Sequence, residues 1–344
     1  MERDELYMHR CLQLATLASG QVAPNPMVGA VLVHDDRIIG EGYHMAFGQP
    51  HAEVNCLNAV SNDDKHLISK STLYVSLEPC AHHGKTPPCA DLIIINKIPK
   101  VVIGCRDPFT EVNGRGIEKL TAAGVEVTEG VLKNKCTSLN KRFLTFHTQH
   151  RPYIILKWAQ SMDHRIAGPG SERIAITNHF TNIRVHQWRG EEASILVGTT
   201  TALIDNPSLT TRLWKGNNPI RMVIDKNLRL PASLHLFDRR VKTIVFNNSL
   251  DQATDNLVYV KVHKTSFPES IIGYLFRENI LSVFIEGGSK LLQSFINIGL
   301  WDEARVITNK DLMIGEGVVA PDLGPCRLVN QEDIYNDLIH YYYK

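Results

Sequence analysis

The sequence lacks an excess of charge of either sign. Its 37 lysine and arginine residues face 36 aspartate and glutamate residues, which leaves a formal net charge of +1. A protein that binds nucleic acid through the phosphates usually carries a clear basic surplus, so the balance argues against that class. Hydrophobic residues make up 43% of the chain, too many for intrinsic disorder. The composition predicts a folded protein without a nucleic-acid partner.

Long apolar runs are missing as well. The longest, such as residues 29–33 and 92–95, are far shorter than the ~20 residues that span a bilayer. Glu2, Asp4 and Glu5 stand where a secretory signal would have a basic start and an apolar run. We therefore expect a cytoplasmic protein with no membrane partner. In such a protein the seven cysteines are more often metal ligands, catalysts or buried residues than disulfides.

The order of predicted elements indicates two α/β domains. At roughly 150 residues per domain, 344 residues correspond to a little over two domains. Predicted strands at 28–34, 72–77 and 100–104 alternate with helical stretches, as in a layered α/β fold. The stretch 133–151 is polar and basic, and is expected to be a linking helix with a connector. The pattern restarts at Pro152, so we predict domains at 1–145 and 150–344.

A histidine and two cysteines in the first domain have the chemistry of a zinc site. His51 opens a predicted helix, Cys80 follows a predicted strand, and Cys89 follows a proline-rich loop. Zinc prefers nitrogen and thiolate ligands, and a catalytic site keeps one position for water. Glu53 stands two residues after His51, where a carboxylate can exchange protons with that water. This is the layout of zinc-dependent base deaminases, whose metal lowers the pKa of its water toward ~7.

A structural interpretation of the same residues stays open, in which His51 caps a helix and the cysteines only pack. H-x-E alone is a weak signal, but its combination with E-P-C and a second nearby cysteine is specific. The remaining cysteines lack partners at ligand spacing and are expected to be structural; they are Cys11, Cys56, Cys105, Cys136 and Cys326.

The loop between the two cysteines departs from the usual P-C-x-x-C. Residues 79–89 read P-C-A-H-H-G-K-T-P-P-C, which resembles the P-C-x-H-x-G-[KR]-T-P-P-C loop of riboflavin-pathway pyrimidine deaminases. Residues 24–29, P-N-P-M-V-G, resemble the P-N-P-x-V-G segment of that family. Over nearly its whole length the chain resembles the bacterial bifunctional diaminohydroxyphosphoribosylaminopyrimidine deaminase / 5-amino-6-(5-phosphoribosylamino)uracil reductases. The resemblance implies a cytidine-deaminase-like three-layer domain followed by a dihydrofolate-reductase-like domain.

The resemblance also implies four substrate contacts in the deaminase half, namely Asn25, His44, His82 and Lys85. An asparagine amide can pair with a pyrimidine edge as both donor and acceptor, and a lysine attracts a phosphate. The plainer interpretations are a turn residue for Asn25 and a solvated loop residue for Lys85.

The second half carries weaker signals. It has no Rossmann fingerprint, since Gly168-Pro169-Gly170 is not followed by a glycine at the right place. Residues 281–290, L-S-V-F-I-E-G-G-S-K, predict a strand that enters a helix through two glycines, a local structure suited to phosphate. An ordinary strand-to-helix turn is the alternative. Three arginines, Arg173, Arg189 and Arg212, are candidates for a phosphorylated sugar, because arginine binds phosphate bidentately. For any one of them, a surface ion pair is the alternative.

For this half the resemblance implies both a cofactor site and a substrate site. The NADPH positions are Ala159, Ala175, Thr201, Asp205, Gly288, Ser289, Lys290, Leu291, Leu292, Gln293 and Ser294. The substrate positions are Arg173, Arg189, Leu209, Arg212 and Glu286. Two departures stand out. Ala175 offers the cofactor only its backbone or a methyl group, and His164 stands where glycine is common, so a positive φ there would strain it.

The sequence thus predicts a bifunctional riboflavin biosynthesis enzyme. The first reaction is the zinc-dependent hydrolytic deamination of 2,5-diamino-6-(5-phosphoribosylamino)pyrimidin-4(3H)-one. The second is the NADPH-dependent reduction of its ribose side chain to 5-amino-6-(5-phosphoribitylamino)uracil. One zinc ion per chain is expected, and a homo-oligomer by resemblance. The alternatives are a deaminase with a degenerate second domain, a tRNA or cytidine deaminase with an unrelated second domain, and a non-enzymatic zinc scaffold with His82 as a fourth ligand.

Overall fold

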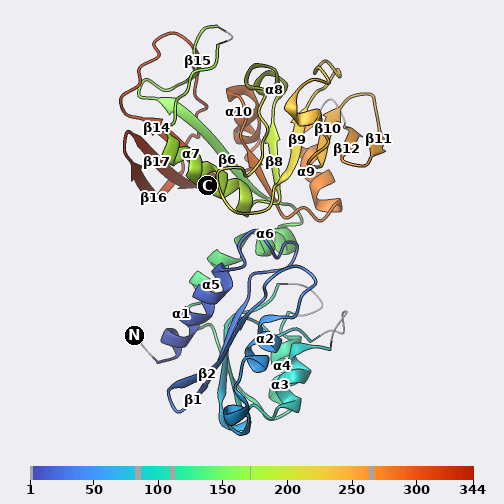
Figure 1. Ribbon diagram of the computed structural model, residues 1–344, viewed down its shortest axis with the longest axis vertical. Helices are drawn as coiled ribbons and strands as arrows, with labels where there is room; N and C mark the ends of the chain where they lie inside the picture. The colour runs from blue at the N-terminus through green and yellow to red at the C-terminus, as the bar shows by residue number, and fades with distance from the viewer. Residues whose placement is uncertain (1–2, 82–86, 109–112, 171, 263–266) are drawn as a thin grey trace. The chain divides into compact units, whose positions relative to one another are not determined.

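The computed structural model describes residues 3–81, 87–108, 113–170, 172–262 and 267–344 (Figure 1). The chain divides into two compact units, Met1–His150 and Arg151–Lys344, and each is described by itself. Within the described ranges, every helix is too short or too polar to cross a membrane.

The first unit is built on a five-stranded sheet of order β2-β1-β3-β4-β5. Its strands are β1 (Gly29–His34), β2 (Arg37–Tyr43), β3 (Thr72–Leu77), β4 (Lys100–Cys105) and β5 (Glu126–Glu129). β1 pairs antiparallel with both β2 and β3, whereas β3, β4 and β5 run parallel. Asp35 and Asp36 join β1 to β2 with φ of 45° and 63°, as a two-residue hairpin turn requires.

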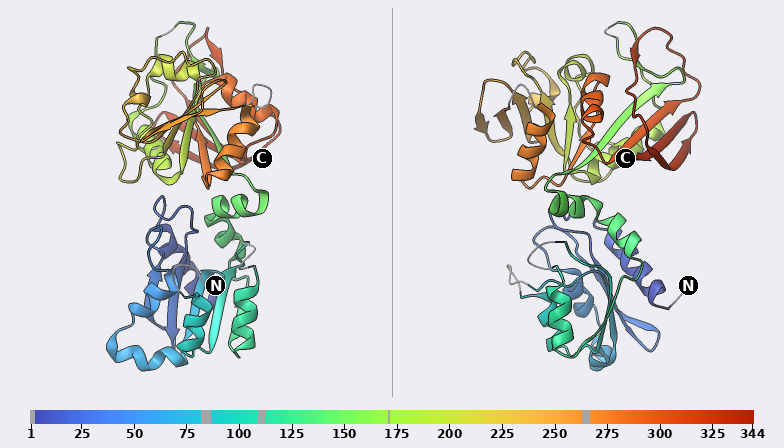
Figure 2. Two further views of the ribbon diagram at one scale, coloured as in Figure 1. Left: turned by 90° about the vertical axis from the view of Figure 1, so that its right-hand side faces the viewer. Right: turned by 180° about the vertical axis from the view of Figure 1, so that it is seen from behind.

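Helices cover both faces of this sheet, which confirms the predicted three-layer domain (Figures 1 and 2). On one face lie α1 (Arg3–Thr16) and α5 (Lys133–Leu139), which share a buried cluster that includes Met8 and Cys136. The other face carries the remaining layer, α2 (Ala52–Asn58), α3 (Cys89–Ile95) and α4 (Arg115–Ala122). The unit also contains η1 (Asn62–Lys70) and α6 (Lys141–Gln149).

Close packing of α2 on β2 sets the position of the α2 N-terminus. A Cβ atom on Gly42 would lie 2.2 Å from the backbone nitrogen of Cys56 and 2.6 Å from the carbonyl oxygen of Ala52. Only glycine allows this approach. The start of α2 thereby comes to the same edge of the sheet as the chain that leaves β3.

The second unit contains a ten-stranded sheet of order β11-β12-β10-β9-β8-β13-β6-β14-β17-β16. In chain order its strands are β6 (Tyr153–Ser161), β8 (Ser194–Val197), β9 (Ile220–Ile224), β10 (Thr243–Asn247), β11 (Gln252–Thr254), β12 (Leu257–Lys261), β13 (Ser282–Ile285), β14 (Glu303–Asn309), β16 (Arg327–Ile334) and β17 (Asp337–Tyr343). The strands from β12 to β14 in this order run parallel, and β11, β17 and β16 pair antiparallel with their neighbours. A separate ribbon pairs β7 (Arg165–Ala167) with β15 (Val318–Val319).

Two hydrophobic clusters pack against opposite faces of this sheet. One involves α9 (Phe267–Arg277) and α10 (Ser289–Asn297), and the other involves α7 (His179–Glu191). Figure 1 shows α7 in front of the strands, and the view from behind in Figure 2 shows α9 and α10 in front. The unit also contains α8 (Thr199–Asp205) and η2 (His235–Phe237). The adjacent parallel strands β8, β13 and β6 end at one edge, where open α/β sheets bind ligands.

Candidate active sites

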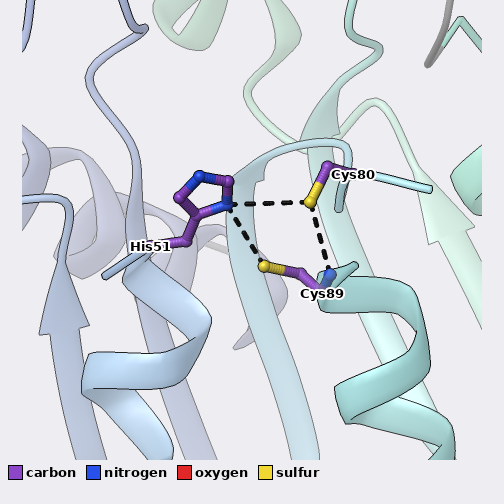
Figure 3. Close-up of side chains that lie close together, drawn as sticks. All are labelled: His51, Cys80 and Cys89. Carbon is purple, nitrogen blue, oxygen red and sulfur yellow. Dashed lines mark hydrogen bonds between the residues drawn. The ribbon is translucent and has the colours of Figure 1, made fainter. Parts of the chain in front are cut away.

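His51, Cys80 and Cys89 form a compact group in the first unit (Figure 3). His51 Nδ1 lies 3.7 Å from Cys80 Sγ and 3.3 Å from Cys89 Sγ, and the Cys89 backbone N–H donates to Cys80 Sγ at 3.3 Å. His51 occupies the N-cap position of α2, but its side chain makes no capping hydrogen bond. Its imidazole faces the two sulfur atoms instead.

The spacing of these three ligand atoms fits a zinc ion. Zinc bonds of about 2.3 Å to sulfur and about 2.0 Å to nitrogen, at tetrahedral angles, put such atoms about 3.5 Å apart. No other group of three histidine, cysteine or acidic side chains in the described ranges has comparable spacing. A hydrogen bond between the thiols lowers the pKa of Cys80 and raises that of Cys89. One thiolate is thus favoured before any metal binds.

Glu53 lies next to this group and is buried. Its side chain is 3% exposed on α2, and its carboxyl group forms a hydrogen bond with the Cys89 thiol. Burial, together with the neighbouring Cys80, raises the pKa of Glu53 to about 6. Because burial outweighs the opposing charge of His51, this carboxyl group keeps a high affinity for a proton.

Two of the four predicted substrate contacts meet beside the same group. Asn25 Nδ2 lies 3.0 Å from His44 Nε2, and His44 Nδ1 lies 3.0 Å from the carbonyl oxygen of Pro50. Since a carbonyl only accepts, His44 donates from Nδ1 and accepts from Asn25 at Nε2. Burial lowers the pKa of His44, which agrees with this neutral form. His82 and Lys85 lie outside the described residues.

The second unit holds a buried cluster of opposite charges at the end of β13. Arg189 of α7 donates from Nε and Nη2 to the two carboxylate oxygens of Glu286, at 2.7 and 2.8 Å. Lys157 of β6 places its Nζ atom 3.6 Å from Glu286 Oε2. Burial alone raises the pKa of Glu286, but Arg189 and Lys157 outweigh it and hold that pKa at about 2. The carboxyl group therefore stays ionised at neutral pH.

The three arginines predicted from the sequence lie close enough for their charges to interact. The pKa of Arg212 is lowered by burial and by the positive charges of Arg189 and Arg173. Burial and the positive charges of Arg189 and Arg212 lower the pKa of His186 to about 4. Leu209, on the same loop as Arg212, is buried with a φ of 51°. A concentration of positive charge of this kind favours an anionic ligand.

The predicted cofactor residues border the same edge. Thr201 on α8 accepts a hydrogen bond from the Gly288 backbone N–H at 2.9 Å, which ties α8 to the start of α10. A Cβ atom on Gly287 would lie 2.9 Å from the Gly198 nitrogen, so the two backbones pack directly. Asp205 ends α8, and burial raises its pKa. The predicted run from Gly288 to Ser294 forms the N-cap and the first part of α10.

The two remaining cofactor candidates differ in their surroundings. Ala159 lies on β6, in register with Ile307 of β14. Ala175 is exposed and lies outside any helix or strand.

Comparisons with known proteins match both halves of the chain. A family model described as "Cytidine and deoxycytidylate deaminase zinc-binding region" matches residues 1–105, and one described as "RibD C-terminal domain" matches residues 152–336. The riboflavin biosynthesis protein RibD of Aquifex aeolicus (strain VF5) is 38% identical over 329 residues, which are 94% of this chain and 91% of that protein. The chain belongs to the RibD family.

Solved structures of RibD-family proteins agree. A crystal structure of a diaminohydroxyphosphoribosylaminopyrimidine deaminase/5-amino-6-(5-phosphoribosylamino)uracil reductase from Thermotoga maritima superposes with a TM-score of 0.91 at 36% identity. The superposition covers 99% of this chain and 98% of the Thermotoga maritima chain. RibD of Acinetobacter baumannii, form 1, has a TM-score of 0.89 at 29% identity, with the same coverage.

This RibD-family chain is therefore a bifunctional deaminase and reductase of riboflavin biosynthesis. The predicted fold class is confirmed: an N-terminal cytidine deaminase domain precedes a reductase domain like dihydrofolate reductase. The reductase model spans most of the second unit, which counts against an unrelated or degenerate second domain. The enzymatic assignment likewise replaces the interpretation as a zinc scaffold.

Lys157 and His186 of this RibD-family reductase were missed by reasoning from the sequence. The available signal was a lysine inside the apolar run Tyr153–Trp158, because a charge in a buried strand needs a partner. The φ of His164, which stands where glycine is common, is positive at 57°. Its Nδ1 atom lies 2.9 Å from Gln160 Nε2, so the side chain has a partner at this strained position.

Proposed function

We propose that the chain deaminates 2,5-diamino-6-(5-phosphoribosylamino)pyrimidin-4(3H)-one and then reduces the ribose side chain of the product with NADPH. The observation that supports this most is the presence of two chemical centres in two separate units. One centre has metal-ligand spacing beside a buried glutamate. The other has an ion-paired glutamate among several cations.

In the deaminase we assign the zinc ligands to His51, Cys80 and Cys89, with one ion per chain. When bound, zinc supplies a water of lowered pKa for the hydrolysis. Glu53 moves the proton from that water to the departing amino group, so that water and the amine become the carbonyl product and ammonia. Asn25 and His44 orient the pyrimidine, and Lys85 and His82 complete the contacts with the substrate.

In the reductase we assign the cofactor to the edge formed by α8 and the start of α10. Thr201, Asp205 and residues 288–294 would bind NADPH there, with Ala159 and Ala175 beside it. The cofactor supplies the hydride. Glu286 and Leu209 orient the substrate, and Arg173, Arg189 and Arg212 attract its phosphate. The protein's part in this step is mainly positioning.

Replacement of Glu53 by Gln tests the division of labour. We expect ammonia release to fall by a factor of about 100 to 10,000, the usual contribution of a proton-transfer group. NADPH oxidation with pre-deaminated substrate should be unchanged. Glu41→Gln is the matched control, because Glu41 lies in the same unit but pairs with Arg10. An equal loss of both activities in Glu53→Gln would contradict two independent sites.

The cofactor assignment has a direct test in the wild-type protein. With pre-deaminated substrate, oxidation of NADPH should have a kcat/KM at least about tenfold above that of NADH, the effect of about one good interaction. A preference for NADH would refute the assignment. The proposal also includes a cytoplasmic location and a homo-oligomer; the homo-oligomer is expected from the family resemblance and is measurable by light scattering.

A further inference from the structure

A single asparagine between the last two helices of the first unit holds the segment that carries Asn25. Asn140 Oδ1 accepts from the Met27 backbone N–H at 2.8 Å, and Asn140 Nδ2 donates to the Met27 carbonyl oxygen at 2.9 Å. Both polar groups of one peptide residue are thus bound by one side chain. Asn140 is 3% exposed, so these hydrogen bonds are shielded from water.

The rest of Asn140 is already fixed by the helices on either side. Its backbone N–H donates to the Cys136 carbonyl oxygen of α5, and its carbonyl oxygen accepts from Leu144 of α6. Its side chain makes no capping hydrogen bond to α6. The carboxamide therefore does not cap either helix, and among the described residues it binds the two backbone groups of Met27.

Met27 lies in the stretch 26–28, which belongs to no helix or strand and leads into β1. Two residues before it, Asn25 meets His44, and the His44 backbone N–H donates to the Val28 carbonyl oxygen at 3.0 Å. His44 in turn contacts Pro50, the residue before His51. Alternating hydrogen bonds and peptide bonds thus join Asn140 to the group of candidate metal ligands.

We propose that Asn140 is a positioning residue of the deaminase, which sets the place of Asn25 through the backbone of Met27. This rests on the proposed function in so far as Asn25 and His44 contact the substrate. It extends the deaminase site to the α5–α6 junction, beyond residue 105, where the match to the deaminase model ends. The helices that lead out of the first unit then belong to its active machinery.

Asn140→Asp in the full-length protein is the sharpest test. It keeps an oxygen that accepts from the Met27 N–H, but it replaces the N–H donor by a second oxygen, which repels the Met27 carbonyl oxygen. We expect KM for deamination to rise about tenfold with little change in kcat, the effect of one misplaced hydrogen-bonding group. Zinc content and NADPH-dependent reduction of pre-deaminated substrate should not change.

Asn247→Asp is the matched control. Asn247 of the second unit binds the N–H and the carbonyl oxygen of Leu250 in the same way, at 2.6 and 2.9 Å. That substitution should leave KM for deamination unaltered. If Asn140→Asp gives no folded protein, Asn140→Ser removes the amide without adding a charge and takes its place.

A double-mutant cycle with Asn25→Ala separates positioning from a general loss of stability. If Asn140 acts through Asn25, Asn140→Asp will raise KM no further once Asn25 is alanine. An unchanged KM in Asn140→Asp, or a full additional rise in the double variant, would overturn the positioning role while the Asn25 contact stands. An unchanged KM in Asn25→Ala alone would instead refute the proposed Asn25 contact, and the positioning role with it.

Discussion

Two buried glutamates, one in each unit, have pKa values shifted in opposite directions. Among the described residues Glu53 forms no ion pair with a lysine or arginine, and burial outweighs the charge of His51 and raises its pKa to about 6. The side chain of Glu286 is only 8% exposed, but Arg189 and Lys157 hold its pKa at about 2. One carboxyl group is poised to exchange a proton, whereas the other is a fixed negative charge that organises its neighbours. The partner of a buried carboxyl group, more than its burial, decides which chemistry it can perform.

The two surroundings also differ in how the chain builds them. The group around Glu53 comes from the starts of α2 and α3 and the end of β3. A metal site demands donor atoms at fixed distances, so its residues recur at recognisable spacings. The group around Glu286 takes single side chains from β6 and α7 and from the end of β13. Such a cluster cannot be predicted from spacing along the sequence, because only the order of strands in the sheet brings its members together.

The largest expected effect comes from breaking the first group, with Cys89→Ser. Loss of a thiolate ligand should release the metal and reduce deamination at least about a thousandfold, because the metal's contribution is several kcal/mol. Reduction of pre-deaminated substrate should continue at the wild-type rate. Zinc analysis and ammonia release check this, with the partly buried Cys326→Ser as control. Stoichiometric zinc in Cys89→Ser would show that the assigned ligand set is wrong.

A smaller loss of activity is expected from Arg189→Gln, which removes the main cationic partner of Glu286 and so brings its surroundings closer to those of Glu53. Breaking a buried ion pair costs about 3–5 kcal/mol, and loss of the oriented charges should slow reduction about a hundredfold. In the wild type, the stabilisation from Glu286 is present above its unfolded pKa and is lost as pH falls through about 2. In the variant the pKa of Glu286 rises toward its unfolded value, so the protein should be less stable at neutral pH, and the part of the acid-dependent loss of stability that Glu286 causes should shrink.

Acid unfolding curves and NADPH oxidation measure these effects. Arg184→Gln is the matched control, since Arg184 lies on the same helix and pairs with Glu332, with side chains 36% and 27% exposed. A surface pair is worth ~0–1 kcal/mol, so this variant should behave like the wild type. If Arg189→Gln has the acid unfolding curve of the wild type, Arg189 does not hold Glu286 ionised.

Much of the fold was predictable because its buried strands alternate with helices in the sequence. Strands such as β3 were placed from their β-rich composition alone. The strands after residue 300 and the helix α8 were not predicted. Most of β16 is exposed and polar, and α8 begins with three threonines, which are poor helix formers. Their conformation depends on packing that a local pattern does not contain.

The sites divide along the same line. The group of His51, Cys80 and Cys89 could be predicted from spacing, and the arginines of the reductase from a family resemblance. Lys157 and Asn140 could not, since each matters through one partner distant in the sequence. The stretch 133–151 was predicted as a linking helix with a connector. The structure shows two helices, and the residue between them contacts the deaminase segment.

The smallest expected effect tests whether a departure from the family pattern weakens the reductase. His164 combines a φ of 57°, which costs about 1 kcal/mol or more for a side chain, with a hydrogen bond to Gln160 worth about 1 kcal/mol. His164→Gly loses both the strain and the hydrogen bond. The equilibrium constant of unfolding and KM for NADPH should therefore each stay within about twofold of the wild-type values. His164→Ala keeps the strain but loses the bond, so it should be less stable than His164→Gly by about 1 kcal/mol in denaturant unfolding. Equal stability of the two variants would mean that the backbone at this position is not strained.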